Sequence, residues 1–344
     1  MRKITLILVA LVLICFCICT PFIYKILLSD NINDIPGQQT RTIYIPSGGN
    51  FESVLNSLKQ QRVLKNTKTF IWFAKKINYD KCIYPGRYVL SNNSGNLLIL
   101  GKLRTGKQDP IQITFNNIQN KKQLAKRIAG KLEATEQELI DAFNQPELLD
   151  SLHLTEENFT TIFLANTYEF YWNTSANQFV QRMLKEYNKF WTSRKRRKAE
   201  ELNLSPTEVI ILASIVQKES NHYDEYPRIA GVYINRLNKG IALQADPTVM
   251  FALNRLGIKR RVYKNDLKTP SPYNTYISPG LPPGPICLPE LKSIEKILDA
   301  EQHNYIYFCA KEDFSGYHAF AETWQQHLQN ARQYQRALNR HNIH

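Results

Sequence analysis

The segment Ser205–Ser220, with the sequence SPTEVIILASIVQKES, contains the signals of a buried helix that ends in a carboxylate. Ser205 can cap the helix, Pro206 suits its first position, and Glu208 completes a capping box. Residues spaced by 3, 4 and 7 positions lie on one face of a helix. This spacing places Leu212, Ile215, Val216 and Glu219 on the same face. The sequence therefore predicts a helix whose apolar face ends at the Glu219 side chain.

Glu219 is the first candidate for a catalytic role. Burial disfavours the charged form of a carboxyl group and raises its pKa from about 4.3 toward neutrality. A carboxylic acid that stays protonated near pH 7 is what cleavage of a glycosidic bond requires of its general acid, as in lysozyme. A glutamate at the C-terminal end of a helix can also turn back to solvent, and periodicity alone leaves that alternative open.

The segments after this helix are rich in amide, hydroxyl and tyrosine side chains. A second amphipathic helix is expected over 225–237, with Gly240 as its terminator. Three loops follow, with the sequences LQADPTV at 243–249, SPYNTY at 271–276 and GLPPGPI at 280–286. Amides and hydroxyls can hydrogen-bond to sugars, and tyrosine rings can stack on them. The candidate substrate-binding residues are Asn235, Gln244, Asp246, Thr248, Tyr273, Asn274, Thr275, Tyr276 and His318.

Two of these candidates have open alternatives. Asp246 can act as a second acid, but its position before a proline favours a structural or substrate-orienting role. His318, in the segment GYHAF at 316–320, can line a cleft or be a hydrogen-bonded core histidine. The histidines show no HExxH or other metal-ligand spacing, so no metal is expected.

Five segments together resemble the YceG-like family of endolytic murein transglycosylases: ASIVQKES, IAGVYINRL, LQADPTV, SPYNTY and GLPPGPI, in this order. The resemblance implies a single-pass inner-membrane protein that faces the cell wall and cleaves nascent glycan strands internally. It places the catalytic glutamate at Glu219. Many family members have a second glutamate where this chain has Gln217, which supports Glu219 as the acid. The segment ICLPE at 286–290 departs from the Asn-Pro-Gly type of turn that is common in the family.

The resemblance also implies a reaction without metal or cofactor. Glu219 would protonate the glycosidic oxygen between N-acetylmuramic acid and N-acetylglucosamine. It would then act as base toward the muramyl C6 hydroxyl, which attacks C1 and leaves a 1,6-anhydro end; such cleavage can terminate glycan elongation. Two alternatives stay open: a lysozyme-like muramidase that uses water with Asp246, and a non-catalytic wall-binding scaffold.

The N-terminus predicts a membrane anchor at residues 1–28. Arg2 and Lys3 precede an apolar run from Ile4 to Tyr24, about the 20 residues that span a bilayer core. A cleavable signal peptide is the alternative, but the run is long for one and no small-x-small cleavage site ends it. The positive-inside rule then places the N-terminus in the cytoplasm and the catalytic domain in the periplasm, attached to the inner membrane.

The remainder of the chain predicts an α+β protein. A polar linker at 29–40 leads to a subdomain at 41–112 in which strand, helix, helix and strand follow one another. This order resembles a LysM-type carbohydrate module, and a packing subdomain that never touches glycan is the alternative. A larger α+β catalytic domain is expected over 113–344.

Composition and charge limit the partners. With 344 residues, 43% hydrophobic and 22% charged, the chain is neither mostly disordered nor a polytopic membrane protein. The net charge of +14 favours an acidic polymer or anionic lipid, and the expected topology argues against nucleic acid. The expected partners are peptidoglycan glycan strands and inner-membrane lipid, and cell-wall synthases or divisome and elongasome proteins fit the same location. Cys82, Cys287 and Cys309 lie beyond the anchor, and an odd number implies no complete set of disulfides.

Overall fold

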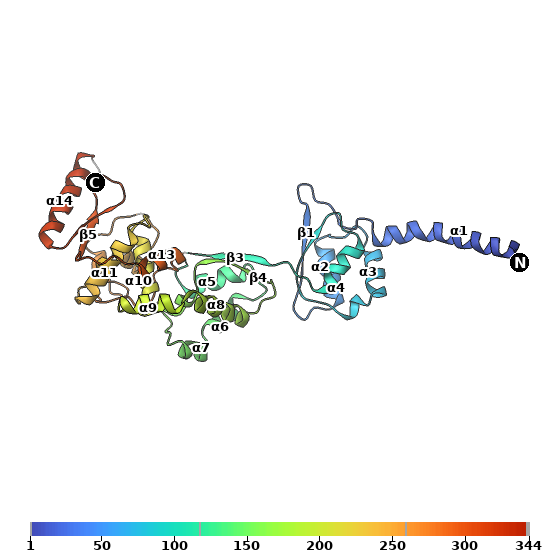
Figure 1. The fold of residues 1–344 in the computed structure, drawn as a ribbon, viewed down its shortest axis with the longest axis horizontal. Helices are drawn as coiled ribbons and strands as arrows, with labels where there is room; N and C mark the ends of the chain where they lie inside the picture. Colours follow the sequence, from blue (N-terminus) through green and yellow to red (C-terminus); the bar gives the residue numbers. More distant parts are fainter. Residues whose placement is uncertain (1, 117, 259, 342–344) are drawn as a thin grey trace. The chain divides into compact units, whose positions relative to one another are not determined.

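The computed structural model describes residues 2–116, 118–258 and 260–341, with the side chains of 2–12, 15, 18 and 151 left out. The chain divides into two compact units (Figure 1). The first comprises Met1–Ile113, Lys131–Ala134 and Glu169–Ser175, and the second comprises Thr114–Gly130, Thr135–Tyr168 and Ala176–His344. Both units combine helices with two-stranded sheets, so the α+β prediction is confirmed.

The first unit contains the predicted order of strand, helix, helix and strand. Its elements are α1 (Arg2–Leu27), β1 (Thr40–Ile45), α2 (Phe51–Gln60), α3 (Thr67–Lys76), η1 (Tyr79–Lys81), β2 (Gly86–Ser91) and α4 (Asn96–Thr105). β1 and β2 pair antiparallel, with Thr42 opposite Val89. Successive side chains of a strand point to opposite faces, so alternate residues of both strands enter one core with α2, α3 and α4. Members of this core include Ile43, Ile45, Val54, Leu58, Phe70, Ala74, Tyr88 and Leu90.

Helix α1 covers the predicted anchor, and its last turn packs onto the first unit. Ile26 is buried, and Asn96 Nδ2 donates a hydrogen bond to the Ile26 carbonyl oxygen at 2.7 Å. Among the described residues, no helix is long and apolar enough to cross a membrane. The anchor prediction rests on the apolar run from Ile4 to Tyr24. Within this run, the side chains of residues 4–12 are not described by the structure.

The segment expected as a linker also contacts the first unit. Ile32 is fully buried, and Asn31 Nδ2 donates to Asn96 Oδ1 at 2.7 Å. The Asn31 Oδ1 atom accepts from the Asn66 backbone N at 2.7 Å, at the start of α3. These contacts fix the beginning of the segment to α3 and α4.

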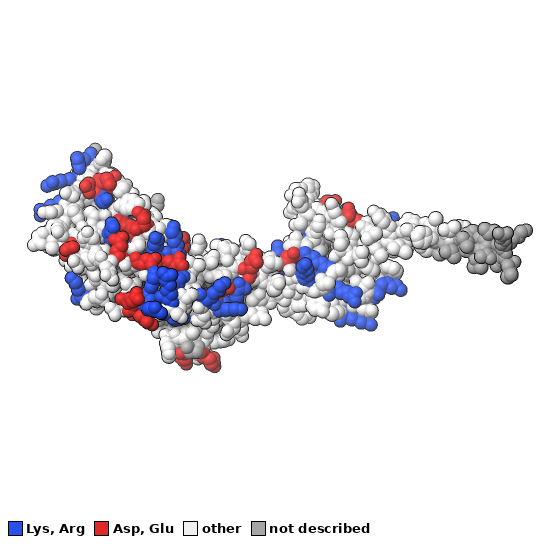
Figure 2. All heavy atoms as spheres, in the orientation of Figure 1, with Lys and Arg blue, Asp and Glu red and all other residues white. Residues whose placement is uncertain are grey.

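Lys and Arg side chains gather around α3 on the face of the first unit that Figure 2 shows. Lys68, Lys75 and Lys76 of this helix are exposed. Their charge is therefore available to an anionic partner.

The second unit is mainly helical. Its elements are α5 (Lys121–Ala129), α6 (Glu136–Phe143), α7 (Pro146–Ser151), η2 (Phe159–Ile162), α8 (Ala176–Phe190), α9 (Ser193–Glu201), α10 (Pro206–Glu219), α11 (Tyr226–Asn238), α12 (Asp246–Ala252), η3 (Asp266–Lys268), α13 (Leu291–Leu298), β5 (Tyr307–Ala310), β6 (His318–Ala321) and α14 (Trp324–Arg340). The chain passes between the units along β3 (Ile111–Phe115) and β4 (Asn166–Phe170), which pair with each other.

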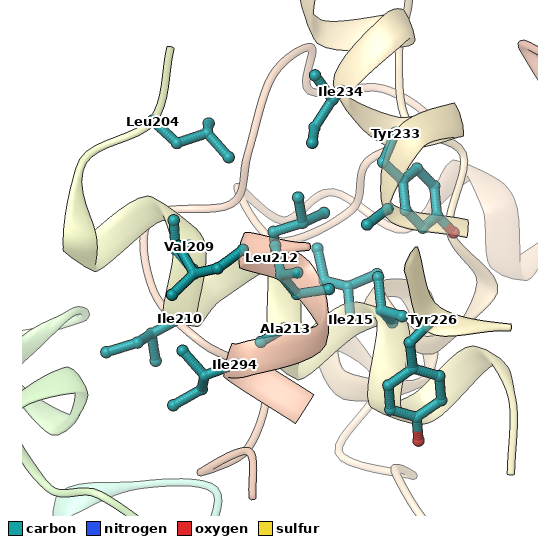
Figure 3. Close-up of a cluster of buried hydrophobic side chains, with 14 of the residues drawn as sticks. Leu204, Val209, Ile210, Leu212, Ala213, Ile215, Tyr226, Tyr233, Ile234 and Ile294 are labelled. Carbon is teal, nitrogen blue, oxygen red and sulfur yellow. The ribbon is translucent and has the colours of Figure 1, made fainter. Parts of the chain in front are cut away.

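Helix α10 is the centre of the second unit's core. Its capping box forms as predicted: Ser205 Oγ accepts from Glu208 N at 3.2 Å, and Glu208 Oε2 accepts from Ser205 N at 2.8 Å. The prediction of a single apolar face was too narrow, because every residue from Val209 to Val216 is buried. Helices α9, α11, α12 and α13 contact α10, and Figure 3 shows Tyr226 and Ile294 of two of these helices beside it.

The hairpin of β5 and β6 follows α13. Its strands pair antiparallel, with Phe308 opposite Phe320, and α14 packs against both strands. The partly buried rings of Phe308 and Phe320 pack against the α10 core. This packing brings residues from the C-terminal region to the end of α10.

Candidate active site

A cavity of about 370 Å³ contains the Glu219 side chain. Its walls come from the end of α10, from α11, from the start of α12 and the loop before it, and from the hairpin and α14. The polar side chains that line it include Glu219, Arg236, Gln244, Asp246, Tyr276 and His318. Four of the predicted substrate-binding residues are thus brought together around Glu219.

The turn after α10 directs Glu219 into this cavity. Ser220 leaves the helix with an extended backbone, at φ −133° and ψ 152°. Tyr226 Oη donates to the Ser220 carbonyl oxygen at 3.0 Å, and Ser220 itself is buried. Because the helix end is packed rather than frayed, the Glu219 side chain meets the cavity and not open solvent.

The surroundings of Glu219 favour its protonated form. Tyr233 Oη, from α11, donates a hydrogen bond to Glu219 Oε1 at 2.6 Å. Burial raises the pKa of Glu219 to about 7; the Tyr233 hydrogen bond lowers it, Asp246 raises it and His318 lowers it. The carboxyl group therefore exchanges its proton near neutral pH, where general acid–base catalysis is most effective.

Asp246 and Tyr276 form a pair on another wall of the cavity. Tyr276 Oη donates to Asp246 Oδ1 at 2.6 Å. Burial, together with the Asp246 carboxylate, raises the pKa of Tyr276 above its ordinary value, so this phenol remains a donor. Asp246 is exposed at the first position of α12, so a ligand in the cavity can reach it.

Arg236 supports the loop that carries Gln244. Its Nη1 donates to the Leu243 carbonyl oxygen at 2.6 Å, and its Nη2 donates to Gln244 Oε1 at 3.1 Å. Gln244 has φ +54°, in the left-handed region that side chains rarely adopt. Arg236 and Tyr233 were not among the predicted site residues. Both lie on one face of α11 at a spacing of three residues, a signal that could have indicated them.

Three predicted substrate-binding residues are fully buried: Thr248, Asn274 and Thr275. The hydroxyls of Thr248 and Thr275 are 2.8 Å apart, and Thr275 Oγ1 accepts from Ala245 N at 3.0 Å. Asn274 Nδ2 donates to two backbone carbonyls of its own loop. A side chain without exposed surface cannot touch a ligand, so these residues instead hold the loops that form the cavity wall.

Asn235 and Tyr273 also lie outside the lining of this cavity. Asn235 Nδ2 donates to the carbonyl oxygens of His303 and Tyr305 at 2.7 and 3.0 Å, which fixes the chain ahead of β5. Tyr273 packs on Phe251 with ring centroids 4.7 Å apart. The loop chemistry that suggested sugar binding is used here for internal packing.

Gln217 points to a different neighbour than Glu219. Its Oε1 accepts from Glu290 N at 2.8 Å and from Ser293 Oγ at 2.6 Å. This amide joins α10 to the start of α13. Glu219, two residues later, is the side chain of this helix end that lines the cavity.

His318 lines the cavity from β6 and is held by Glu225. Its Nδ1 is 2.7 Å from Glu225 Oε2, and its backbone N donates to Glu225 Oε1 at 2.8 Å. Burial alone would raise the pKa of Glu225, but the interactions with His318, together with a hydrogen bond from the Ser220 side chain, outweigh it and hold the pKa below its ordinary value. Sequence reasoning missed Glu225, because the two partners are 93 positions apart.

The arrangement is suited to acid–base chemistry on a hydroxyl-rich ligand. The carboxyl group of Glu219 can deliver and recover a proton, and the surrounding amide, phenol, imidazole and carboxylate groups can hydrogen-bond to sugars. The described side chains contain no group of three or more His, Cys, Asp or Glu that could hold a metal ion.

Comparisons with known proteins agree with one another. The family described as the YceG-like family matches residues 43–333. An endolytic murein transglycosylase of Bacillus subtilis (strain 168) is 29% identical over 304 residues, covering 84% of this chain and 83% of that protein. An endolytic murein transglycosylase of Streptococcus pneumoniae serotype 2 (strain D39) is 26% identical over 303 residues, covering 78% of this chain and 54% of that protein. The crystal structure of a yceG-like protein from Listeria monocytogenes is 26% identical, with a TM-score of 0.54 over 85% of this chain and 98% of that one.

Proposed function

Since the chain belongs to the YceG-like family, we propose that it is an endolytic peptidoglycan lytic transglycosylase. Such a lyase cleaves the bond between N-acetylmuramic acid and N-acetylglucosamine inside a glycan strand. The observation that carries the proposal is the environment of the Glu219 carboxyl group. This group lies in a cavity, and burial raises its pKa to about 7. The names of the similar proteins from Bacillus and Streptococcus support the same reaction class.

In the first step Glu219 is the general acid. It donates its proton to the glycosidic oxygen while the bond from that oxygen to the muramyl C1 breaks. The N-acetylglucosamine end leaves with a new hydroxyl, and positive charge develops on the muramyl ring. The hydrogen bond from Tyr233 Oη to Glu219 Oε1 stabilises the carboxylate that remains.

In the second step the same residue is the general base. The Glu219 carboxylate takes the proton of the muramyl C6 hydroxyl as that oxygen bonds to C1. A 1,6-anhydro ring closes, no water is consumed, and Glu219 is again protonated. The nucleophile belongs to the substrate, so a second protein carboxylate is not needed.

The other polar residues of the cavity would hold the sugar. Gln244 and Asp246 are exposed on one wall, and His318 lies on the hairpin wall. Their amide, carboxylate and imidazole groups can bind sugar hydroxyl and acetamido groups. We assign them to substrate orientation.

Replacement of Glu219 tests the mechanism. Glu219→Gln keeps the shape and can still accept the Tyr233 hydrogen bond, but it cannot donate and recover a proton. We expect release of anhydromuropeptides from purified sacculi to fall by at least the 10²–10⁴-fold that general acid–base catalysis typically contributes. Asp246→Asn should cost less, because it disturbs only orientation. The measurement is mass spectrometry of the released fragments.

The matched control is Glu295→Gln on α13. Glu295 is exposed and pairs with Lys195 at 2.8 Å, a surface ion pair that contributes about 0–1 kcal/mol. This variant should digest sacculi as the wild type does. Activity retained in Glu219→Gln would overturn the mechanism.

A muramidase is the second candidate, because Asp246 and Glu219 line the same cavity. In that reaction water attacks C1, and the products carry reducing ends rather than anhydro ends. A muramidase with a carboxylate pair should also lose activity heavily in both Glu219→Gln and Asp246→Asn. A wall-binding scaffold would bind sacculi and release nothing.

The location is a separate proposal. The apolar run from Ile4 to Tyr24 behind Arg2 and Lys3 supports an inner-membrane anchor with the catalytic unit in the periplasm, where it could terminate nascent strands and meet cell-wall synthases. Membrane fractionation combined with protease accessibility in spheroplasts tests this topology. Recovery of the full chain in the soluble fraction would contradict it.

A further inference from the structure

Two neighbouring acidic residues join the turn between α10 and α11 to the β5–β6 hairpin. Asp224 Oδ2 accepts from Tyr317 Oη at 3.0 Å; Asp224 is exposed and Tyr317 is half-buried. Glu225 binds the next hairpin residue, His318, through its ring and its backbone N. The Glu225 side chain is only 3% exposed and that of His318 is 12% exposed. The two bonds thus share a location but differ in burial.

Glu225 leaves His318 little freedom. A buried carboxylate is costly unless its oxygens accept hydrogen bonds, and both Glu225 oxygens accept from the same residue. Because the carboxylate can only accept, the proton between the pair sits on His318 Nδ1. The opposite ring nitrogen, Nε2, has no hydrogen-bond partner in the described part of the chain, and the ring itself lines the Glu219 cavity.

We propose that Glu225 is a positioning residue that fixes the His318 ring so that Nε2 meets a hydroxyl or acetamido group of the sugar beside Glu219. This proposal deepens the transglycosylase assignment and rests on it. Phe308, from the paired strand, supports the same orientation. Its ring packs edge-to-face with the His318 ring, and the two ring centroids are 5.1 Å apart. Glu225 itself touches no substrate in this arrangement.

The Glu225–His318 pair also affects the pKa of Glu219. Charged or titratable groups surround the Glu219 cavity on several elements. They come from α11 (Tyr233 and Arg236), from α12 and the 276 loop (Asp246 and Tyr276), from β5 (Tyr307 and Cys309), from β6 (His318) and from α14 (His327). His318 is among those that lower the pKa of Glu219. Loss of its fixed position should therefore raise the pKa of Glu219, while the other groups stay in place.

Glu225→Gln is the first test variant. The glutamine side chain has one oxygen in place of two. If that oxygen accepts the hydrogen bond from the His318 backbone N, the amide nitrogen faces His318 Nδ1 and cannot accept from it. We expect kcat to fall roughly tenfold to 10²-fold, the loss that misplacement of a catalytic-site group by about 1 Å can cause. The high-pH limb of kcat/KM should also move upward, because Glu219 would keep its proton to higher pH. His318→Gln should show both effects, and the double variant should lose no more than His318→Gln alone.

Asp224→Asn is the matched control. It weakens the neighbouring bond to Tyr317 and so loosens the same hairpin, but it leaves the Glu225–His318 pair intact. We expect its kcat and its pH profile to match the wild type. If Asp224→Asn and Glu225→Gln cause equal losses, or if the losses of Glu225→Gln and His318→Gln add, Glu225 only anchors the hairpin and the proposal is wrong.

A readout without turnover separates this proposal from the assigned activity. Nuclear magnetic resonance of the purified full chain, labelled at the glutamate side-chain carboxyl carbons and the histidine ring nitrogens, reports the Glu219 titration and the His318 tautomer. Glu225→Gln should raise the Glu219 midpoint and change the His318 tautomer. An unchanged midpoint and tautomer would overturn the proposal even in an active enzyme. A wild type that releases no anhydromuropeptides would instead overturn the assigned function, with the titration still deciding the role of Glu225.

Discussion

At the scale of single residues, ionisation of Glu219 should weaken the fold. The folded-state pKa is about 7, against an ordinary value of 4.5, so the folded state binds this proton more tightly than the unfolded state. Its contribution to stability is fully present below pH 4.5, falls as pH rises to about 7 and is lost above that. The raised pKa corresponds to on the order of 3 kcal/mol at most.

Glu219→Gln should remove this pH dependence, because glutamine cannot ionise. We expect the variant to resist urea better than the wild type at pH 8 and to match it more closely at pH 5. Urea unfolding of both proteins at the two pH values checks this. Equal losses of stability between pH 5 and pH 8 in both proteins would show that Glu219 is not the cause.

The neighbours of Glu219 should shift its proton in opposite directions. The Asp246 charge raises the pKa of Glu219 and the Tyr233 hydrogen bond lowers it. Asp246→Asn should therefore move the high-pH limb of kcat/KM downward, and Tyr233→Phe should move it upward. The pH dependence of kcat/KM on isolated glycan strands measures both. Shifts in the same direction would mean that another group controls this limb.

At the scale of elements, α11 packs so closely on the segment before β5 that position 231 requires glycine. A Cβ at Gly231 would lie 2.4 Å from the Glu301 carbonyl oxygen and 2.6 Å from His303 Nε2. Alanine is about 1 kcal/mol better than glycine inside a helix, whereas overpacking costs about 1–3 kcal/mol. Because one of the close atoms is backbone, the clash should win.

Gly231→Ala should therefore lower the midpoint of thermal unfolding. The matched control is Gly101→Ala on α4, where the new Cβ would have no atom within 4 Å apart from its chain neighbours and the backbone of its own helix; it should stabilise by up to about 1 kcal/mol. Calorimetry of the two variants distinguishes the cases. A stabilising Gly231→Ala would mean that the 301–303 segment can move away from α11.

The basic run at 194–198 contains side chains that form ion pairs and others that are exposed to solvent. Lys195 pairs with Glu295 of α13, and Lys198 pairs with Asp299, the residue that follows the end of α13. Arg194 and Arg197 are exposed on α9. Surface ion pairs contribute about 0–1 kcal/mol each, so this run joins α9 to α13 only weakly and leaves part of its charge for solvent or an anionic partner.

At the scale of the whole molecule, the net charge of +14 should make wall binding depend on salt. Lys and Arg lie over both units in Figure 2, next to acidic residues in the second unit. Sedimentation with sacculi, using Glu219→Gln to prevent digestion, should show weaker binding as the Debye length falls from about 10 Å at 0.1 M to about 3 Å at 1 M. Binding that does not change with salt would indicate that stacking and hydrogen bonds, rather than charge, hold the glycan.

The sequence by itself determined the features that depend on local spacing. The capping box at Ser205, the length of α10 and the strand–helix–helix–strand order follow from periodicity and turn chemistry, which act within a few residues. Glu219 could be singled out in the same way, because an acidic residue that continues the apolar face of a helix can be recognised from sequence spacing alone.

Only the tertiary structure decided which polar side chains meet that acid. Thr248, Asn274 and Thr275 have the same chemistry as a sugar-binding residue, but their hydrogen bonds are made inside the protein. Glu225 and His318 form a pair across 93 positions. Spacing along the chain carries no information about such contacts, since they arise when the hairpin packs against the core around α10, and burial then decides which groups face a ligand and which only support the wall.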